Sequence, residues 1–288
     1  MRPTVFTEPH AMQCWAESAR VAGSRIALVP TMGALHAGHL ALIDAAKQHA
    51  DRVVVSIFVN PIQFNRRDDF DRYPRHLDAD ASACATAGVD AIYAPTPGAM
   101  YPEGFDANVE ITRVAAPLCG QARPGHFRGV TTVVTKLFNA VRPHVAVFGE
   151  KDFQQLAVLR RMTADLDFGI EIVGVPTVRE PDGLALSSRN RLLSADERRA
   201  ALCVPHALEA AETGLSHGER RAVAVGDLAA QVIEAEPRAR LEYAELRDPA
   251  TLEEVEVVDG PTLLALAVWV GDVRLIDNRI LDPGRTSR

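Results

Sequence analysis

The stretch PTMGALHAGH, residues 30–39, stands between an apolar run at 25–29 (RIALV) and a segment with helical spacing at 38–50. The apolar run predicts a buried strand that ends at Pro30, and the following spacing predicts a helix with one apolar face. A polar turn between a buried strand and a helix is typical of a parallel α/β sheet, whose ligands bind beyond the carboxyl ends of the strands. The turn therefore predicts both a class of fold and the place of a ligand site.

Apolar runs and helical patterns continue to alternate to about residue 180. The runs predict strands at 52–59, 89–93, 145–148 and 170–175, and the periodic segments predict helices at 76–87, 130–141 and 153–165. The Val and Thr content of 130–141 would also allow a strand. The β-α order predicts parallel strands with right-handed helical crossovers, which is a Rossmann-like α/β sheet.

The pattern changes after about residue 190. Two amphipathic segments predict helices at 195–213 and 219–236, and three apolar runs predict strands at 240–246, 263–270 and 273–280. We expect a Rossmann-like domain over residues 1–184. We expect a smaller C-terminal α+β domain over residues 185–288 that closes over the ligand site.

Composition and charge indicate which partners and which compartment to expect. The net charge of −7 disfavours nucleic acid as a partner, because nucleic-acid binding draws on Lys and Arg to neutralise phosphates. No apolar run approaches the 18 residues or so of a membrane-spanning helix, so we expect no membrane partner. The four cysteines lack metal-ligand spacing and are interpreted as reduced thiols of a cytoplasmic protein.

Two histidines give the turn at 30–39 its chemistry. His36 and His39 are three residues apart, so on a helical turn they point to one side. Gly33 and Gly38 let a ligand approach the backbone, and the helix N-terminus favours phosphate. The imidazoles could hydrogen-bond the phosphates of ATP and stabilise a departing pyrophosphate. The alternatives are a glycine-rich turn with incidental histidines, or a zinc site, which lacks a third ligand of suitable spacing nearby.

A second polar cluster lies at 176–191. Ser187, Ser188 and Arg189 form an anion-binding group, because arginine offers a bidentate fork to phosphate oxygens. Asp182-Gly183 marks a turn, so we expect this segment to move and close over bound nucleotide. The alternative is a loop that only caps the following helix.

Three further segments follow or flank predicted strands. Gln63 lies in a loop after the 52–59 strand, and its amide can both donate and accept. Lys151 follows the 145–148 strand and can neutralise phosphate, while Arg123 is available to a phosphate or a carboxylate. Asp78 and Asp80 are candidate Mg²⁺ ligands, with a solvated helix face as the alternative.

Together these segments resemble the pantothenate synthetase family. The matching blocks are PTMGALHAGH, FVNPIQF, YPR, RPGHFRGV, FGEKDFQQ and LSSRN, which are spread from residue 30 to residue 190 in the family's order. The first block carries the H-x-G-H signature of the nucleotidylyltransferase superfamily, and LSSRN resembles its second signature. The C-terminal third matches by position and size more than by motif.

The resemblance implies a role for each matching residue. His39 takes the proton-donor role, assisted by His36, and Lys151 and Arg189 act at the phosphates. Gln63 and Gln155 would contact pantoate, Gln63 would also contact β-alanine, and Arg123 would face a substrate. The implied ATP-binding residues are Met32, Gly33, Ala34, Leu35, His36, Ala37, Gly38, His39, Gly149, Glu150, Lys151, Asp152, Val178, Leu186, Ser187, Ser188 and Arg189.

The resemblance also implies a reaction. Pantoate attacks Mg-ATP to give pantoyl adenylate and pyrophosphate, and β-alanine then displaces AMP to give pantothenate. The family is typically a cytoplasmic homodimer. Ala79 stands where some relatives carry an acidic residue, which weakens a carboxylate pair for Mg²⁺ and leaves Asp80 as the candidate. Leu186 replaces the methionine of some relatives, a change that conserves volume.

Two other interpretations stay open at this point. One is another adenylate-forming or nucleotidylyl-transferring member of the superfamily, including a tRNA-charging enzyme. The other is a non-catalytic nucleotide-binding protein on the same fold, since fold alone does not fix function.

Overall fold

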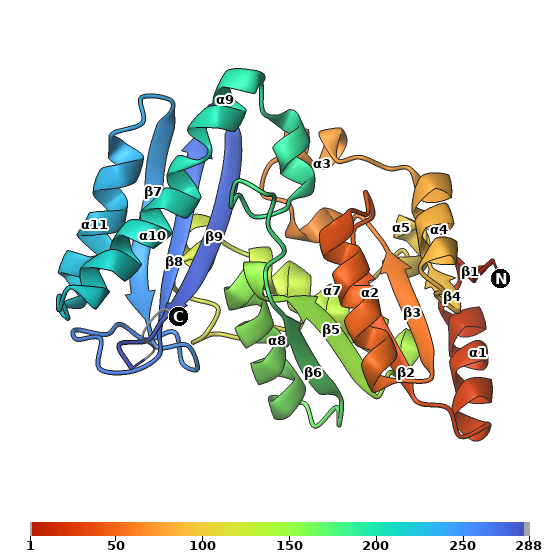
Figure 1. Ribbon diagram of the computed structural model, residues 1–288. Coiled ribbons are helices and arrows are strands. Elements are labelled where there is room, and N and C mark those ends of the chain that lie inside the picture. Colours follow the sequence, from red (N-terminus) through yellow and green to blue (C-terminus); the bar gives the residue numbers. More distant parts are fainter. Residues whose placement is uncertain (1, 285–288) are drawn as a thin grey trace. The chain divides into compact units, whose positions relative to one another are not determined.

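The computed structural model describes residues 2–284 (Figure 1). The chain forms two compact units. Unit 1 comprises the residues up to Glu150 together with Val158–Pro176, and unit 2 comprises Lys151–Ala157 and the residues from Thr177 onward. Each unit is described by itself below.

Unit 1 is built on a six-stranded sheet with the order β1-β4-β3-β2-β5-β6, and every pairing in it is parallel. This confirms the predicted Rossmann-like sheet. The three-residue edge strand β1 was not predicted, because it is too short to show a period and is ordered by its pairing with β4. The strands are β1 (Thr4–Phe6), β2 (Ile26–Thr31), β3 (Arg52–Ile57), β4 (Ala91–Tyr93), β5 (Val145–Gly149) and β6 (Glu171–Val175).

The order of the strands reverses at β2. From β2 the chain proceeds through β3 to β4 on one side, and β5 and β6 lie on the other. β2 and β5 pair at Ala27–Val145 and Leu28–Ala146, and each strand then continues beyond this pairing. A crevice at such a reversal is the usual ligand site of an open α/β sheet.

Pro30 lies inside β2, although the sequence predicted that the strand would end there. Thr31 O accepts from Phe58 N on the β3 side, so Pro30, one residue earlier, faces β5. The pairing to β5 has ended by this point. The N–H that proline lacks therefore leaves no ladder bond unmade.

Helices cover both faces of the sheet of unit 1 (Figure 1). α2 packs on β2, β3 and β5, while α7 packs against α1 and η1. The segment predicted at 130–141 is helical and begins earlier, at His126, after Gly125 with a φ of 81°. The helices from the first strand to β6 are α1 (Pro9–Val21), α2 (Ala37–His49), α3 (Arg67–Arg72), α4 (Leu77–Thr86), α5 (Pro97–Met100), α6 (Cys119–Ala122), α7 (His126–Val141) and α8 (Phe153–Asp165), with 3-10 turns η1 (Pro61–Gln63) and η2 (Glu150–Asp152).

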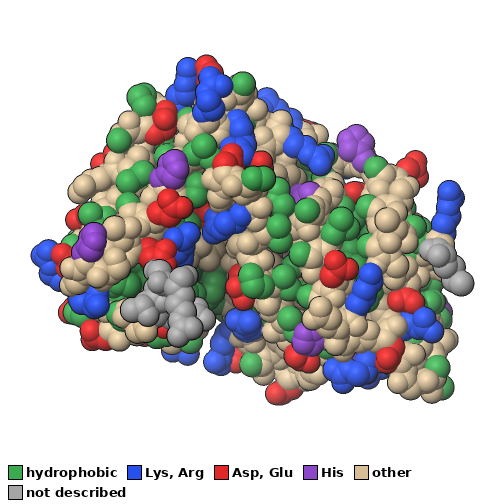
Figure 2. Space-filling view, viewed as in Figure 1, with side chains coloured by type: hydrophobic (Ala, Val, Ile, Leu, Met, Phe, Trp, Pro, Cys, Tyr) green, Lys and Arg blue, Asp and Glu red, His purple; other side chains and the backbone are tan. Residues whose placement is uncertain are grey.

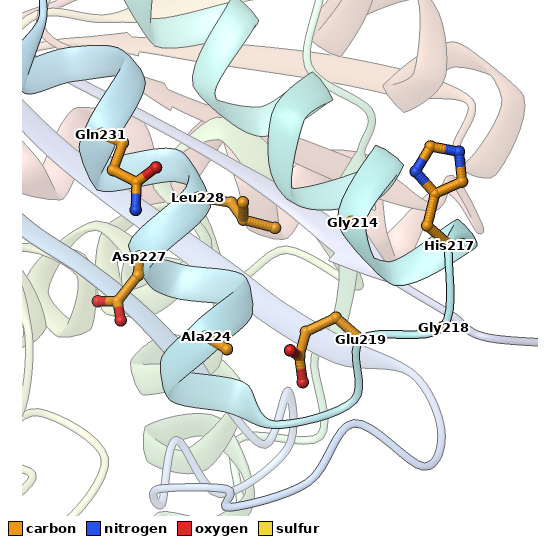
Figure 3. Close-up of a pocket in the computed structure, with 8 residues that line it drawn as sticks. All are labelled: Gly214, His217, Gly218, Glu219, Ala224, Asp227, Leu228 and Gln231. Atoms are coloured by element: carbon orange, nitrogen blue, oxygen red, sulfur yellow. The ribbon is translucent and has the colours of Figure 1, made fainter.

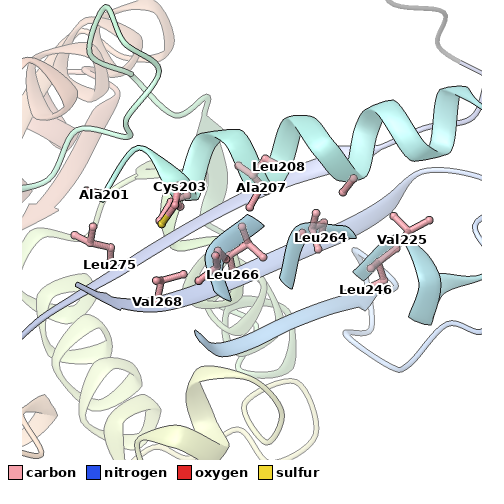
Figure 4. Close-up of a cluster of buried hydrophobic side chains, with 14 of the residues drawn as sticks. Ala201, Cys203, Ala207, Leu208, Val225, Leu246, Leu264, Leu266, Val268 and Leu275 are labelled. Atoms are coloured by element: carbon pink, nitrogen blue, oxygen red, sulfur yellow. The ribbon is translucent and has the colours of Figure 1, made fainter. Parts of the chain in front are cut away.

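Unit 2 contains the antiparallel sheet β7-β8-β9, formed by β7 (Ala239–Arg247), β8 (Thr262–Val270) and β9 (Val273–Leu281). Helices α10 (Cys203–Ser216) and α11 (Ala222–Glu234) pack on it through buried apolar side chains (Figure 4). This confirms the predicted smaller α+β part of the chain.

The helix predicted at 195–213 is two helices, α9 (Ala195–Ala200) and α10. Pro205 explains why the helix is interrupted. It has no N–H to bond the carbonyl of Ala201, and its ring clashes with that carbonyl in a continuous helix. The 3-10 turn η3 (Ser188–Leu192) precedes α9.

On the face drawn in Figure 2, Lys and Arg side chains are interspersed with Asp and Glu. Among residues 2–284, none of the helices combines the length and the apolar character needed to cross a bilayer.

The edge between β2 and β5 predicts a pH dependence of stability. His144 Nδ1 accepts a hydrogen bond from Ile26 N at 2.9 Å. Burial, with help from Arg20 and Arg25, lowers the pKa of His144 below its usual value of 6.5. The unfolded chain then binds the proton first, so this contribution is present above about pH 6.5 and is lost as the pH falls toward the lower folded pKa.

We expect His144→Asn to flatten the pH profile, because the amide oxygen of asparagine accepts the same bond without titrating. Urea unfolding between about pH 7.5 and about pH 5.5 measures the effect. The free energy of unfolding should change more steeply with pH for the wild type than for the variant. The difference in slope should correspond to at most about one bound proton. Parallel profiles would show that His144 does not titrate in this way.

Candidate functional site

The side chain of Thr31 stabilises the turn after β2. Its Oγ1 donates to Ser56 O at 2.8 Å and accepts from Gly33 N at 3.1 Å. Gly33 has a φ of 83°, and a Cβ there would lie 2.8 Å from Asp80 Oδ2. Only glycine suits this position, so the sequence PTMG encodes the start of the turn.

Asp80, on α4, holds the next two residues. Its Oδ2 accepts from Ala34 N at 3.0 Å and its Oδ1 accepts from Leu35 N at 2.8 Å. Ala34 has a left-handed φ of 53°, a strained conformation that these bonds stabilise. Asp80 is only 4% exposed.

This geometry gives Asp80 a structural role that the sequence did not predict. Both oxygens of a buried carboxylate are directed at backbone N–H groups, which is a poor arrangement for a Mg²⁺ ligand. Among the residues that the structure describes, no group of three or more His, Cys, Asp or Glu side chains could hold a metal ion. Asp80 thus has a structural role, and its role as a Mg²⁺ ligand stays a prediction.

His36 and His39 cap the helix that follows. His36 is the N-cap of α2, where its Nδ1 accepts from Gly38 N at 3.2 Å, and His39 Nδ1 accepts from His36 N at 3.3 Å. An imidazole nitrogen that accepts carries no proton, so both neutral rings carry their proton on Nε2. The ring centroids are 4.1 Å apart, which places the two side chains together as the sequence predicted.

Gln63 lies beside this turn. Its Nε2 is 3.4 Å from Met32 Sδ. Its backbone oxygen accepts from His126 Nδ1 at 2.8 Å and from Arg123 Nη2 at 3.2 Å. The structure thus brings Met32, Gln63 and Arg123 together, and it uses part of the Arg123 guanidinium to hold the backbone of η1.

The cluster at 187–189 in unit 2 follows a hairpin. Leu186 N donates to Val178 O at 2.9 Å, and Gly183 occupies the turn with a φ of 90°, as Asp182-Gly183 predicted. Ser187 Oγ accepts from Arg189 N at 3.2 Å, so Ser187 does cap η3. Capping uses a lone pair of the hydroxyl and leaves its proton for another partner, so anion binding stays a prediction.

A partly buried ion pair anchors this hairpin to β9. Arg179 donates through Nη1 and Nη2 to Asp277 at 2.6 and 3.0 Å, and Asp277 is 2% exposed. Asn190 Nδ2 donates to Glu180 Oε1 and to Ala185 O. These bonds position the backbone that carries Ser187, Ser188 and Arg189.

The remaining predicted residues lie around β5 and α8. Gly149 ends β5, and nothing within 4 Å would meet a Cβ there. Lys151 lies in η2, where its backbone oxygen accepts from Asn278 Nδ2 at 2.9 Å. Unit 1 holds residues 32–39, Gln63, Asp80, Arg123, Gly149 and Glu150, and unit 2 holds Lys151, Asp152, Gln155, Val178, Leu186, Ser187, Ser188 and Arg189.

The sequence interpretation missed the residues that orient the site. Asn60 was quoted within FVNPIQF without a role, and Tyr101 and Asp277 were not singled out. Asn60 and Asp277 are nearly fully buried, at 1% and 2% exposure. A polar residue within an apolar run is the one signal that could have found them, because buried polar groups need partners.

A separate open pocket lies between α10 and α11 in unit 2 (Figure 3). Leu228 points toward Gly214 across it, and Asp227 and Gln231 lie along α11. It contains none of the predicted site residues, and we assign it no part in the chemistry.

Comparisons with known proteins agree over nearly the whole chain. A family model described as pantoate-beta-alanine ligase matches residues 4–280. The pantothenate synthetase of Desulfatibacillum aliphaticivorans is 51% identical over 279 residues, covering 97% of this chain and 99% of its own length. That of Syntrophobacter fumaroxidans is 54% identical over 272 residues, covering 94% and 96%.

Solved structures give the same result. The crystal structure of pantothenate synthetase from Thermus thermophilus superposes with a TM-score of 0.91 at 41% identity, covering 97% of this chain and 100% of that one. The pantoate-β-alanine ligase of Francisella tularensis, crystallised with β,γ ATP and β-alanine, has a TM-score of 0.80 at 32% identity, covering 98% and 100%.

The contacts of Asp80 predict the effect of Asp80→Asn. The amide has one acceptor, so its NH₂ group would face the N–H of Ala34 or of Leu35. Loss of a buried, charge-assisted bond should lower the free energy of unfolding by about 2 kcal/mol. Chemical unfolding measures this difference, and Asp78→Asn, at an exposed position of the same helix, is the matched control, with an expected change within about 0.5 kcal/mol.

Magnesium separates the two roles considered for Asp80. If the carboxylate only holds the turn, Mg²⁺ should stabilise the wild type and Asp80→Asn equally, or neither. Stabilisation of the wild type alone by Mg²⁺ would contradict the structural role.

Proposed function

The chain belongs to the pantoate-β-alanine ligase family, and we propose how its residues carry out the reaction of that family. It is an enzyme that condenses pantoate with β-alanine at the expense of ATP. The proposed mechanism rests on one observation, which is that His36 and His39 cap α2 at the point where the strand order reverses. A nucleotide is expected at this point on physical grounds.

The first proposed step forms an adenylate. A carboxylate oxygen of pantoate attacks the α-phosphorus of ATP, the bond to the bridging oxygen breaks, and pyrophosphate leaves with the electron pair. The Nδ1 atoms of His36 and His39 are held by backbone N–H groups, so each ring offers Nε2–H to phosphate oxygens. Charge that develops on the departing pyrophosphate is stabilised by these fixed hydrogen-bond donors, and a neutral His39 keeps its Nε2 proton in this step.

The second proposed step forms the amide. The amine of β-alanine attacks the acyl carbon of pantoyl adenylate, the acyl–oxygen bond breaks, and AMP departs with the electron pair. The attacking NH₂ group loses one proton to solvent or to a neighbouring base and keeps the other as the N–H of the amide. The main contribution of the protein is to hold the two reactants in place and to exclude water from the adenylate.

Residues of unit 2 are proposed to neutralise the phosphates. Lys151 provides a point charge, and Arg189, with Ser187 and Ser188, provides directional donors. The anchoring of the 178–186 hairpin by Arg179 and Asp277 supports this role, because it fixes the backbone ahead of the cluster. Gly149, Glu150, Asp152, Val178 and Leu186 are proposed to complete the nucleotide site.

Substrate recognition is assigned to Gln63, Gln155 and Arg123. Gln63 is proposed to contact pantoate and β-alanine, Gln155 to contact pantoate, and Arg123 to attract a carboxylate. The contact of Gln63 with Met32 supports this assignment, because it places the amide next to the histidine turn.

Mg²⁺ is proposed to act as a counter-ion on the phosphates of ATP, with water completing its shell, since the described residues form no dedicated cage. A cytoplasmic homodimer is proposed on the family resemblance alone. Closure of the C-terminal domain likewise stays a prediction.

An assay with labelled pantoate tests the adenylate. With ¹⁸O in the carboxylate of pantoate, Mg-ATP and β-alanine, we expect pantothenate and AMP in equal amounts, with one labelled oxygen in each AMP. His39→Ala should slow the reaction by about 100-fold or more, because a fixed hydrogen-bond donor to the developing charge is lost.

The products also separate the alternatives. ADP in place of AMP would indicate an acyl phosphate and contradict the adenylate. Release of a stable nucleotidylated product would favour another reaction of the superfamily. Omission of each substrate in turn is the control.

A further inference from the structure

A chain of hydrogen bonds runs behind η1 in unit 1. The hydroxyl of Tyr101 donates to Asn60 Oδ1 at 2.8 Å. Asn60 Nδ2 donates to Gln63 Oε1 at 2.9 Å and to Gly129 O at 3.1 Å. Asn60 is 1% exposed, so water cannot take over these contacts. The last group in this series of hydrogen bonds is the side-chain amide of Gln63, which is proposed to contact substrate.

The carbonyl of Gly129 determines the direction in which these hydrogen bonds are donated. A backbone carbonyl can only accept, so the group of Asn60 that faces it must be the NH₂. The oxygen of Asn60 then faces Tyr101, whose hydroxyl can donate to it. Turning the amide over would set two oxygens against each other at Gly129 and leave a buried donor without a partner, which is costly.

The orientation of the Asn60 amide in turn determines that of the Gln63 amide. Because Asn60 approaches through its NH₂, Gln63 must present Oε1 to it. The NH₂ of Gln63 therefore lies on the other side, where Nε2 contacts the acceptor Met32 Sδ at 3.4 Å. Both neighbours of Gln63 thus require the same orientation, and one N–H of Nε2 remains to donate elsewhere.

The surroundings keep this arrangement rigid. The backbone of Gln63 is held by Arg123 and His126, and a Cβ at Gly129 would lie 2.6 Å from Ile62 O, so α7 touches η1 directly. Burial raises the pKa of Tyr101 above its usual value of 10, so its hydroxyl stays protonated and can donate throughout the working pH range.

We propose that Tyr101 is a positioning residue that acts through Asn60 to hold the amide of Gln63 with its NH₂ toward the substrate. Position 63 then recognises a hydrogen-bond acceptor of pantoate, such as a hydroxyl or carboxylate oxygen, and rejects a donor. This inference rests on the proposed function for the identity of the substrate, and on the contacts alone for the orientation of the amide.

A double-mutant cycle tests the proposal. We expect Tyr101→Phe to lower kcat/KM for pantoate by about tenfold and to leave KM for ATP within about twofold, because a single buried hydrogen bond is lost. In a Gln63→Met background the same substitution should change kcat/KM for pantoate by less than about twofold. An equal loss in both backgrounds would show that Tyr101 does not act through Gln63, and would overturn the proposal.

Tyr93→Phe is the matched control. It removes a hydroxyl from another buried tyrosine of unit 1, on β4, away from this chain of bonds. It should leave kcat/KM for pantoate within about twofold of the wild type. A loss as large as that of Tyr101→Phe would mean that any buried tyrosine hydroxyl matters equally, and would overturn the specific role.

Gln63→Glu tests the polarity directly. An ionised carboxylate keeps the bond from Asn60 but cannot donate, whereas a protonated carboxyl can donate through its O–H. Relative to the wild type, the activity of Gln63→Glu should therefore rise as the pH falls toward about 5, and that of Gln63→Met should not. A ratio of Gln63→Glu to wild type that does not change with pH would contradict an NH₂ that faces the substrate.

A measurement that needs no turnover separates this inference from the proposed function. The side-chain NH₂ signals of Gln63, assigned by their loss in Gln63→Met, should shift in Tyr101→Phe and stay in place in Tyr93→Phe. If no pantothenate forms but the signals shift, the substrate is wrong and the orientation holds. If pantothenate forms and the signals do not shift, the orientation is wrong.

Discussion

The carboxylate of Asp80 holds the turn on which the rest of the site in unit 1 depends. Its two oxygens accept from Ala34 N and Leu35 N, in a turn that would otherwise leave two buried donors unsatisfied and Ala34 in an unfavourable left-handed conformation. The turn sets the residue at which α2 begins. His36 is the N-cap and Ala37 the first residue of α2, so the position of both imidazoles follows from a carboxylate on a different helix.

The same principle recurs wherever a functional side chain is oriented. Each uses one polar atom for a structural bond, and the proposed chemistry uses another. The histidines use Nδ1 to cap α2, Gln63 uses Oε1 to accept from Asn60, and Ser187 uses a lone pair to cap η3. A side chain fixed in this way needs little reorganisation when charge develops near it, which is the physical basis of electrostatic preorganisation.

In unit 2 the bonds that position the site span long stretches of sequence. Arg179 and Asp277 are 98 residues apart, and Lys151 and Asn278 are 127 apart. An ion pair with a buried member adds little net stability when desolvation is counted, but breaking this one would leave the buried charge of Asp277 uncompensated. We infer that the Arg179–Asp277 pair serves chiefly to fix the hairpin ahead of Ser187, Ser188 and Arg189 in one position.

The sequence by itself determined the parallel sheet, the histidine turn and the polar segments at the carboxyl ends of the strands, because apolar period, glycine and chain direction are local properties. It placed the strand 25–29 correctly but ended it at Pro30, since tolerance of proline depends on whether a neighbouring strand needs its N–H. It predicted one helix at 195–213, because apolar spacing continues across the break between Ala200 and Cys203 that Pro205 imposes. Only the tertiary structure decided that Asp80 holds a turn, that Tyr101 and Asn60 orient Gln63, and that Asp277 anchors Arg179. Each of these roles is a hydrogen bond between residues distant in sequence, and no local pattern records which partner a buried polar group will find.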